Sequence, residues 1–587
     1  MEAAVMSSLD DDAETQLLQQ PSPKTKKGGW ITFPFLIATR AGMTVAALGW
    51  SANLIVYLID KYNIESIDAA QIFNVVNGCM ALFPIIVAII ADSFLGCFAV
   101  IWISSIISLL GMVLLTLTAT ISSLRPAPCN EGSSFCTTPS PLEYTNLFLA
   151  VALASIGCAG TSFTVGTMGA DQLDNPEHQE NFFNWFLFVW NAASIISATV
   201  IVYVQDNVSW GLGYGLCAAA NLLGLISFLL GKHYYRYVQP QGSPFKDIAR
   251  VLFAAFSKRK VFLSTRNEDY FSELHLEVDG QHDGIKELAA SATPHKETFK
   301  FLNHAALISQ ADIQSDGSIR QSWKLCTVQQ VEDLKTLLRI APIWATGIFL
   351  TTPMGMLSTL TVLQALTMDT CIVSNFKFPV GSLVVFSLLS GAISLTIVDR
   401  LIFPLWQKTF GKTPTPLQRL GTGHVLNVLS IVIAALVESK RLQIARASYI
   451  VQELTSSTVP MSVFWLVPQL ALSGMGEAFH FPGQASLYYQ EFPASLKSTS
   501  TAMVALLIAI GYYLSTALTD FVRKVTNWLP DDLNHGRLNY LYWVLAMIGA
   551  LNFGLYLTSA GVYKYRNDQD DKTVDNSSNQ GDATLYY

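Results

Sequence analysis

AAQIFNVVNGCMALFPIIVAIIADSFLGCFAVIWISSIISLLGMVLLTLTATISSL, residues 69–124 of the chain, contains a single charged residue, Asp92. The hydrocarbon core of a bilayer is about 30 Å thick, and a helix crosses it with about 20 apolar residues. The stretch is therefore long enough for two crossings, with Asp92 at the turn between them. A strand of a membrane barrel would be about half as long as either part. We predict two transmembrane helices, at 69–91 and 93–124.

The same property recurs along the rest of the chain. Further stretches lack Asp, Glu, Lys and Arg over about 20 residues, and they occupy 41–59, 144–170, 181–205, 207–231, 340–368, 378–398, 420–437, 454–476, 498–519 and 538–563. Together with the first two, they predict an all-α membrane protein of about twelve transmembrane helices.

Composition excludes several other classes of protein. Asp, Glu, Lys and Arg make up 13% of the 587 residues, against about 25% in ordinary globular proteins, so a chain of several soluble domains is excluded. No basic patch is interleaved with exposed aromatic residues, and we expect no nucleic-acid partner. No group of residues has metal-ligand or catalytic spacing. We therefore expect no metal, no cofactor and no enzymatic activity.

The spacing of the spans divides the chain into two halves. Six spans precede Lys232 and six follow Arg339, with a polar stretch between them. Two six-helix halves joined by a long loop are typical of a major facilitator transporter. The predicted parts are a disordered N-tail at 1–29, a six-helix bundle at 30–231, a central loop at 232–338 that is partly helical and partly disordered, a second bundle at 339–563 and a disordered C-tail at 564–587.

The distribution of Lys and Arg predicts the orientation in the membrane. An even number of spans places the two tails, the central loop and the loop between spans eight and nine on one side, and most basic residues lie in these segments. By the positive-inside rule this side is the cytosol. The exceptions, which would lie outside, are Lys440, Arg441, Arg523 and Lys524. The loop that contains Cys129 and Cys136 would also lie outside, where these two residues could form a disulfide.

Several local sequences resemble one family. They are ADSFLGCF (91–98), GADQLD (169–174), FFNWFLFVWNAASI (182–195) and YYQEFPASLKSTSTA (488–502). These segments resemble the signatures of the proton-oligopeptide branch of the major facilitators, and the chain looks like a plant member of the nitrate transporter 1/peptide transporter family. GGWITFPF (28–35) and LCAAANL (216–222) resemble its nitrate excretion transporter subgroup. The resemblance implies that Asp92 belongs to a motif that controls the rocking of the two halves.

The first helix departs from the family pattern in a way that bears on mechanism. Proton-coupled members carry ExxER or ExxEK there, and buried carboxylates of this kind can exchange protons. The corresponding positions hold Arg40, Ala41, Gly42, Met43 and Thr44. The lysine that the fourth helix usually contributes is replaced by Ser162. The resemblance therefore implies a transporter without the usual proton-coupling motif.

The predicted substrate pathway also differs. One family pattern binds nitrate with a histidine on helix seven and a threonine one turn later, and here Met354 and Ser358 occupy these positions. Glu477 aligns with a carboxylate on helix ten that normally pairs with the missing lysine. Arg40 is the candidate cation, although it lies close enough to the end of the span to reach the cytosolic surface instead. Pro353 and Pro482 are expected to break their helices, whose N-terminal ends would attract an anion.

Three hypotheses follow. The leading one is a plasma-membrane transporter for small inorganic anions, nitrate first and chloride second, that facilitates efflux. The second is a proton-coupled carrier of peptides, hormones or glucosides that uses Glu477. The third is a transporter-like sensor or scaffold that signals through its central loop. The expected partners are a small anion, the lipid bilayer and a kinase acting on the cytosolic loops.

Overall fold

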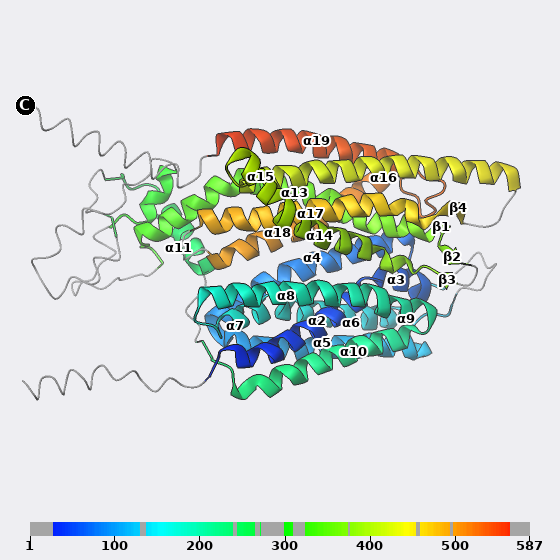
Figure 1. The fold of residues 1–587 in the computed structure, drawn as a ribbon, viewed down its shortest axis with the longest axis horizontal. Helices are drawn as coiled ribbons and strands as arrows, with labels where there is room; N and C mark the ends of the chain where they lie inside the picture. The colour runs from blue at the N-terminus through cyan, green and yellow to red at the C-terminus, as the bar shows by residue number, and fades with distance from the viewer. Residues whose placement is uncertain are drawn as a thin grey trace, which may run out of the picture.

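The computed structural model describes residues 27–128, 137–238, 244–264, 270–271, 299–308, 323–373, 376–452, 458–492 and 497–563. These residues form two helical bundles that lie side by side, with the blue and cyan elements in one and the green to red elements in the other (Figure 1). The elements of the first bundle lie between Trp30 and His233, and those of the second lie between Val328 and Val562. Cys129 and Cys136 lie outside the described residues, so the predicted disulfide stays a prediction.

The N-terminal half contains six antiparallel membrane-spanning units. Its elements are η1 (Trp30–Thr32), α2 (Phe33–Ser51), α3 (Leu54–Tyr62), α4 (Ser66–Ile90), the π-helical η2 (Ala91–Leu95), α5 (Gly96–Thr120), η3 (Ser122–Leu124), α6 (Pro141–Ser162), α7 (Thr164–Ala170), α8 (Pro176–Ile196), the π-helical η4 (Ser197–Ile201), α9 (Val202–Asn207), α10 (Trp210–Leu230) and η5 (Gly231–His233).

The C-terminal half repeats this arrangement. Its elements are α13 (Val328–Leu366), η9 (Val380–Leu383), α14 (Val384–Ile397), the π-helical η10 (Val398–Ile402), α15 (Phe403–Phe410), α16 (Pro416–Gln452), η11 (Val463–Leu466), α17 (Val467–Glu491), α18 (Lys497–Val525) and α19 (Leu538–Val562). Short strands pair at one end of the bundle, β1 (Met368–Asp369) in parallel with β4 (Val459–Ser462), and β2 (Cys371–Val373) antiparallel to β3 (Phe376–Lys377).

The number of spans agrees with the sequence prediction once two details are considered. By length and mean hydropathy, 10 helical stretches among the described residues could cross a membrane. One of them, Ser66–Thr120, has 55 residues and contains both α4 and α5, which reverse direction around Gly96 at φ 75°. The helix α17 is not among the 10, because polar residues such as Glu477 and His480 lower its mean hydropathy. Counting α4 and α5 separately and adding α17 gives about twelve.

Two sequence predictions about helix positions were wrong. The tenth span was placed at 454–476, whereas α17 runs from Val467 to Glu491. A search for charge-free stretches stops at Glu477, although a membrane helix in a bundle can carry a carboxylate on an inward face. The second error concerns the expected helix breaks, because α13 continues through Pro353 and α17 through Pro482. No helix end therefore lies at either proline.

Small residues allow close helix packing in both halves. A Cβ atom on Gly157 of α6 would collide with the backbone of Ser108 on α5, and one on Gly111 of α5 would collide with the backbone of Ala154 on α6. Between α14 and α17, a Cβ atom on Gly474 would collide with the carbonyl of Ser387. Helices in lipid associate through such van der Waals contact, because lipid supplies no hydrophobic driving force between them.

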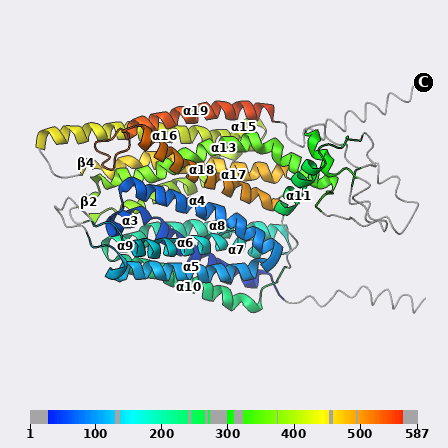
Figure 2. The same cartoon turned by 180° about the vertical axis from the view of Figure 1, so that it is seen from behind.

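The two ends of the molecule differ in what they carry. The start of η1, the end of α19 and α11 (Pro244–Ser257) lie at one end, and the short strands lie at the other (Figures 1 and 2). We call these the termini end and the far end. Three of the four basic residues that the predicted topology places outside lie at the far end in ion pairs, and one of them is Lys524, which pairs with Asp520 at 2.7 Å. Arg441 pairs with Glu438 at 2.7 Å, and Arg523 pairs with Asp68 at 2.6 Å.

The predicted central loop contains a small packed core. The helix α11 packs with η8 (Lys300–Ala305) and with the first turns of α13, which begins inside the predicted loop. The side chains of this core include Val251, Ala254, Leu302 and Val331. Arg250 and Lys258 hold it together by donating hydrogen bonds to the carbonyls of Leu325 and Leu307 at 2.6 and 2.7 Å.

Candidate transport cavity

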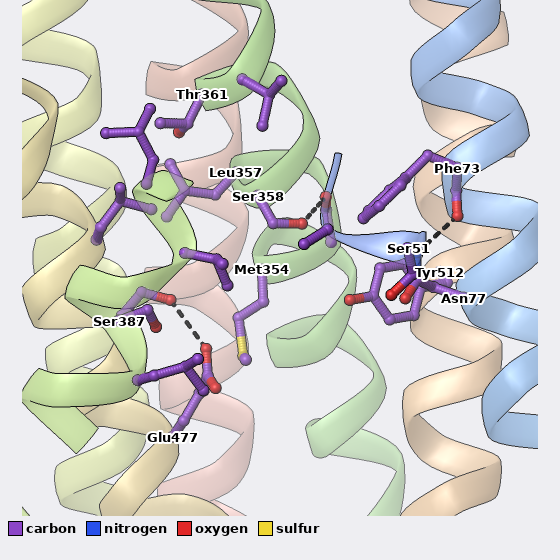
Figure 3. Close-up of a pocket in the computed structure, with 18 of the residues that line it drawn as sticks. Ser51, Phe73, Asn77, Met354, Leu357, Ser358, Thr361, Ser387, Glu477 and Tyr512 are labelled. Atoms are coloured by element: carbon purple, nitrogen blue, oxygen red, sulfur yellow. Dashed lines mark hydrogen bonds between the residues drawn. The ribbon is translucent and has the colours of Figure 1, made fainter. Parts of the chain in front are cut away.

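A cavity of about 330 Å³ lies between the two halves. The N-terminal half contributes residues from the end of α2 and from α4, and the C-terminal half contributes residues from α13, α14, α17 and α18. Figure 3 shows Phe73 and Asn77 of α4 across the cavity from Glu477 of α17. A site enclosed by two halves that can rock against each other is the expected position for a transported solute.

Three of the predicted pathway residues line this cavity. Met354 and Ser358 lie one turn apart on α13, and Glu477 faces them from α17 (Figure 3). The Ser358 hydroxyl donates a hydrogen bond to the Gly355 carbonyl at 2.9 Å, which leaves its oxygen able to accept one. The Ser473 hydroxyl donates to Oε1 of Glu477 at 3.3 Å. The residues that the family pattern selected on these two helices therefore face the same cavity, and their role in transport stays a prediction.

The lining of the cavity is mostly apolar, with a few hydrogen-bonding groups. Glu477 is the only acidic or basic residue among its described lining residues. The neutral polar groups include the side chains of Asn77, Ser387 and Tyr512. The Asn77 amide donates to the Phe73 carbonyl at 2.8 Å, so its oxygen remains available to a solute. Sequence reasoning did not select these three residues, because nothing in a single sequence shows which face of a membrane helix meets a cavity.

Arg40 and Ser162 contact each other at a position closer to the termini end than the cavity. Nη1 of Arg40 donates to the Ser162 carbonyl at 3.2 Å, and the guanidinium lies 4.5 Å from the centre of the Phe186 ring. No ion pair of Arg40 is found in the described part of the chain, and its Nε has no hydrogen-bond partner there. Arg40 precedes the cavity residue Leu48 by two helical turns, about 12 Å along the axis, and lies toward the termini end.

The other first-helix candidates are buried away from the cavity lining. Met43 is 5% exposed and its methyl group approaches Gly224 of α10. Thr44 is 6% exposed, and its hydroxyl lacks a hydrogen-bond partner among the described residues. Neither residue is one of those that line the cavity. The structure thus places the substituted first-helix motif outside the cavity lining, with Arg40, its charged member, two turns from the cavity toward the termini end.

Asp92 lies in the π-helical turn η2 between α4 and α5, at the termini end. Within the described residues its side chain caps neither helix and forms no ion pair. Its neighbour is Asp171, whose pKa is raised by burial and further by the Asp92 carboxylate, and lowered by Arg236. The gating role of Asp92 stays a prediction.

Comparison with known proteins agrees with this arrangement. The sequence signature of the POT family matches residues 98–535. The chain belongs to the POT family. Its relatives include "Protein NRT1/ PTR FAMILY 2.7" of Arabidopsis thaliana, 47% identical over 96% of this chain and 98% of the relative. "Protein NRT1/ PTR FAMILY 2.6" of the same plant is 47% identical over 98% of this chain and 99% of the relative. These relatives place the chain in the plant NRT1/PTR family, as the sequence motifs implied.

Solved structures support the fold. This POT-family chain matches the crystal structure of an auto-inhibited POT family peptide transporter with a TM-score of 0.66 at 16% identity, covering 91% of this chain and 97% of that one. It matches the POT family transporter PepTSo with a TM-score of 0.64 at 17% identity, covering 91% and 99%. The protein is an integral membrane transporter with the major facilitator fold, and it is not an enzyme.

Proposed function

We propose that this POT-family member transports small inorganic anions, nitrate first and chloride second, across the plasma membrane, with both termini and the central segment in the cytosol. The observation that carries the proposal is Arg40, a cation with no carboxylate partner among the described residues, two turns from the cavity on the helix that normally carries the coupling carboxylates. Arg40 raises the local anion concentration on the cytosolic approach, and a planar guanidinium suits a planar oxyanion.

The cavity favours a small anion over a zwitterionic peptide. A peptide needs a cation for its carboxylate and an acid for its amine, and the described lining offers only the acid, Glu477. A small anion needs a few hydrogen-bond donors, which Ser358, Asn77 and Tyr512 can supply by rotating their polar groups. A charged Glu477 would repel the anion, so the form that transports it is the one in which Glu477 is protonated.

Alternating access completes the mechanism. The described hydrogen bonds between the two halves link α4 to α18, from Asp68–Arg523 at the far end to Cys79–Tyr513 in the middle of α4. We assign this conformation to the state closed on the outside. Rocking of the halves then exposes the cavity to the other side, and an anion leaving a negative cytosol gains about 2.3 kcal/mol per charge per 100 mV.

The deciding experiment uses proteoliposomes with membrane potential and pH gradient imposed independently. Nitrate or chloride flux should follow the potential more strongly than the pH gradient, because the first-helix carboxylates are absent. Protease cleavage of the central segment only from the extracellular side of sealed vesicles would contradict the orientation. The second candidate is a proton-coupled carrier of an organic solute, favoured by Glu477 in the cavity. Strict acceleration by an inward proton gradient at clamped potential would support that alternative.

A further inference from the structure

The helix α11 has two apolar faces. One face, with Val251, Ala254 and Ala255, is buried in the small core of the central segment. The opposite face exposes Ala249, Leu252, Phe253 and Phe256, which follow the i, i+3, i+4, i+7 spacing of a continuous stripe along one side of a helix. Phe253 is 53% exposed and Phe256 is 67% exposed. Burying the first face therefore leaves a second apolar stripe about half or more exposed at Leu252, Phe253 and Phe256.

Other aromatic side chains of the central segment are exposed as well. Phe262, five residues after the end of α11, is 96% exposed, and Phe301 of η8 is 58% exposed. Trp323 packs edge-on against Phe253, with ring centres 6.3 Å apart. Aromatic rings gathered in this way, beside a membrane bundle, are typical of residues that lie at the boundary between lipid headgroups and acyl chains. We call these side chains together with the α11 stripe the α11 surface.

Basic residues surround the α11 surface. The described segments 244–264, 299–308 and 323–327 contain one acidic residue, Asp247, and their basic residues are Lys246, Arg250, Lys258, Arg259, Lys260, Lys300 and Lys324. Arg250 and Lys258 point into the small core, whereas Lys246, Arg259, Lys260 and Lys300 are exposed. The Arg259 guanidinium lies 4.1 Å from the centre of the Phe256 ring, so a cation borders the apolar stripe directly.

The buried face of α11 places the start of this helix beside the end of a membrane-spanning helix. Ile248 packs against the small core of the central segment and also against the cluster that contains Tyr488 and Phe492 at the termini end of the bundle. Phe492 directly follows α17. The helix α11 thus begins where a membrane-spanning helix ends, which is the depth of the lipid headgroups.

We propose that the α11 surface binds the anionic headgroup layer of the leaflet on the termini side. Its aromatic side chains insert among the lipids, and Arg259 and Lys260 pair with lipid phosphates and carboxylates. The positive charge decides between possible occupants, because a neutral protein partner would not require it, and each Lys or Arg near an anionic surface strengthens binding. The central segment is then anchored on the membrane rather than extended into the cytosol.

The test measures backbone amide exchange in the full-length protein. Single copies are placed in lipid nanodiscs of phosphatidylcholine alone or with added phosphatidylserine, and hydrogen–deuterium exchange is followed by mass spectrometry. Amides of residues 249–262 should exchange more slowly in the anionic nanodiscs, on the order of tenfold. The paired variants Phe253→Ser/Phe256→Ser and Arg259→Gln/Lys260→Gln should each abolish the difference. Lys408→Gln/Lys412→Gln, which removes the same charge from exposed positions near the end of α15, should preserve it.

The outcomes separate the proposal from its rivals. Equal exchange in the two lipids would overturn it, as would a slowing that survives in both α11 variants. Protection that appears in neutral nanodiscs only when a soluble calcium sensor such as calmodulin is added would assign the surface to a protein partner instead. Unchanged exchange at Val331 and Leu334, which pack under α11, confirms that each variant keeps the small core.

Discussion

At the scale of single residues, the proposed anion pathway depends on the positive charge of Arg40. Replacing it with Leu keeps α2 apolar and removes a partly desolvated cation, so nitrate should bind more weakly by about 1–3 kcal/mol, roughly five- to hundredfold. Arg40→Lys should retain part of the effect, since it keeps the charge and loses the planar fork. The measurement is nitrate flux in proteoliposomes, normalised to the amount of reconstituted protein.

Arg419 offers a matched control for this experiment. It is also half-buried near the termini end, with its guanidinium 4.9 Å from the centre of the Phe403 ring and its Nε unpartnered among the described residues. If Arg40 acts through its place on the approach to the cavity, Arg419→Leu should leave nitrate affinity nearly unchanged. An equal loss in both variants, or no loss in Arg40→Leu, would remove Arg40 from the mechanism.

Glu477 should determine how anion flux depends on pH. Because a charged carboxylate in the cavity repels an anion and a neutral one can donate a hydrogen bond, flux should rise as pH falls. Glu477→Gln mimics the protonated form, so this variant should keep potential-driven flux and lose most of the pH dependence. Glu491→Gln is the control, because Glu491 lies on the same helix and accepts a hydrogen bond from Tyr563 at 2.7 Å, away from the cavity. A variant at 477 that loses all flux would favour the proton-coupled carrier.

At the scale of elements, a buried ion pair joins α13, α16 and α19. Arg441 and Glu438 are both fully buried on α16. Glu438 accepts a hydrogen bond from Gln364 of α13, which in turn accepts one from Tyr542 of α19, at 2.7 and 3.1 Å. Arg441→Leu would leave an uncompensated buried carboxylate and should cost about 3–5 kcal/mol of stability. Thermal unfolding in detergent measures this loss, and Glu438→Leu/Arg441→Leu should recover most of it; no recovery would contradict the charge-based explanation.

The same elements show how far the sequence alone could lead. Spans such as α10 and α19 are apolar throughout, and charge-free stretches located them closely. The position of α17 was predicted wrongly because this helix carries a glutamate and a histidine that lie inside the bundle. A single sequence does not show which residues will lie there. Arg441 looked like an extracellular loop charge for the same reason, since its partner Glu438 becomes visible only when α16 is known to continue to Gln452. To identify the cavity residues on α4 and α18, one must know which face of each helix meets the cavity. Family alignment supplied this information only for α13 and α17.

At the scale of the whole molecule, the transport cycle depends on contacts that one state has and the other lacks. A substitution changes the balance between states only if it removes an interaction present in one of them. Arg523 of α18 meets this condition, because it reaches across to Asp68 and Glu65 of the other half at 2.6 and 2.9 Å and also contacts Asp531 at 3.2 Å within its own half. The group lies at the far end, which is the extracellular end in the proposed orientation, and the halves must separate there for the cavity to open outward.

Breaking this contact should shift the protein toward the outward-open state. The four side chains are partly exposed, and such pairs contribute up to about 1 kcal/mol, so Arg523→Ala should change the ratio of the two states by about fivefold. The distance distribution between spin labels at the far ends of α4 and α18 measures this ratio, and the wider separation should gain population. Lys524→Ala is the matched control, since Lys524 pairs at 2.7 Å with Asp520 on its own helix. An unchanged distribution in Arg523→Ala, or the same shift in Lys524→Ala, would mean that the Arg523 contacts do not hold the outside closed.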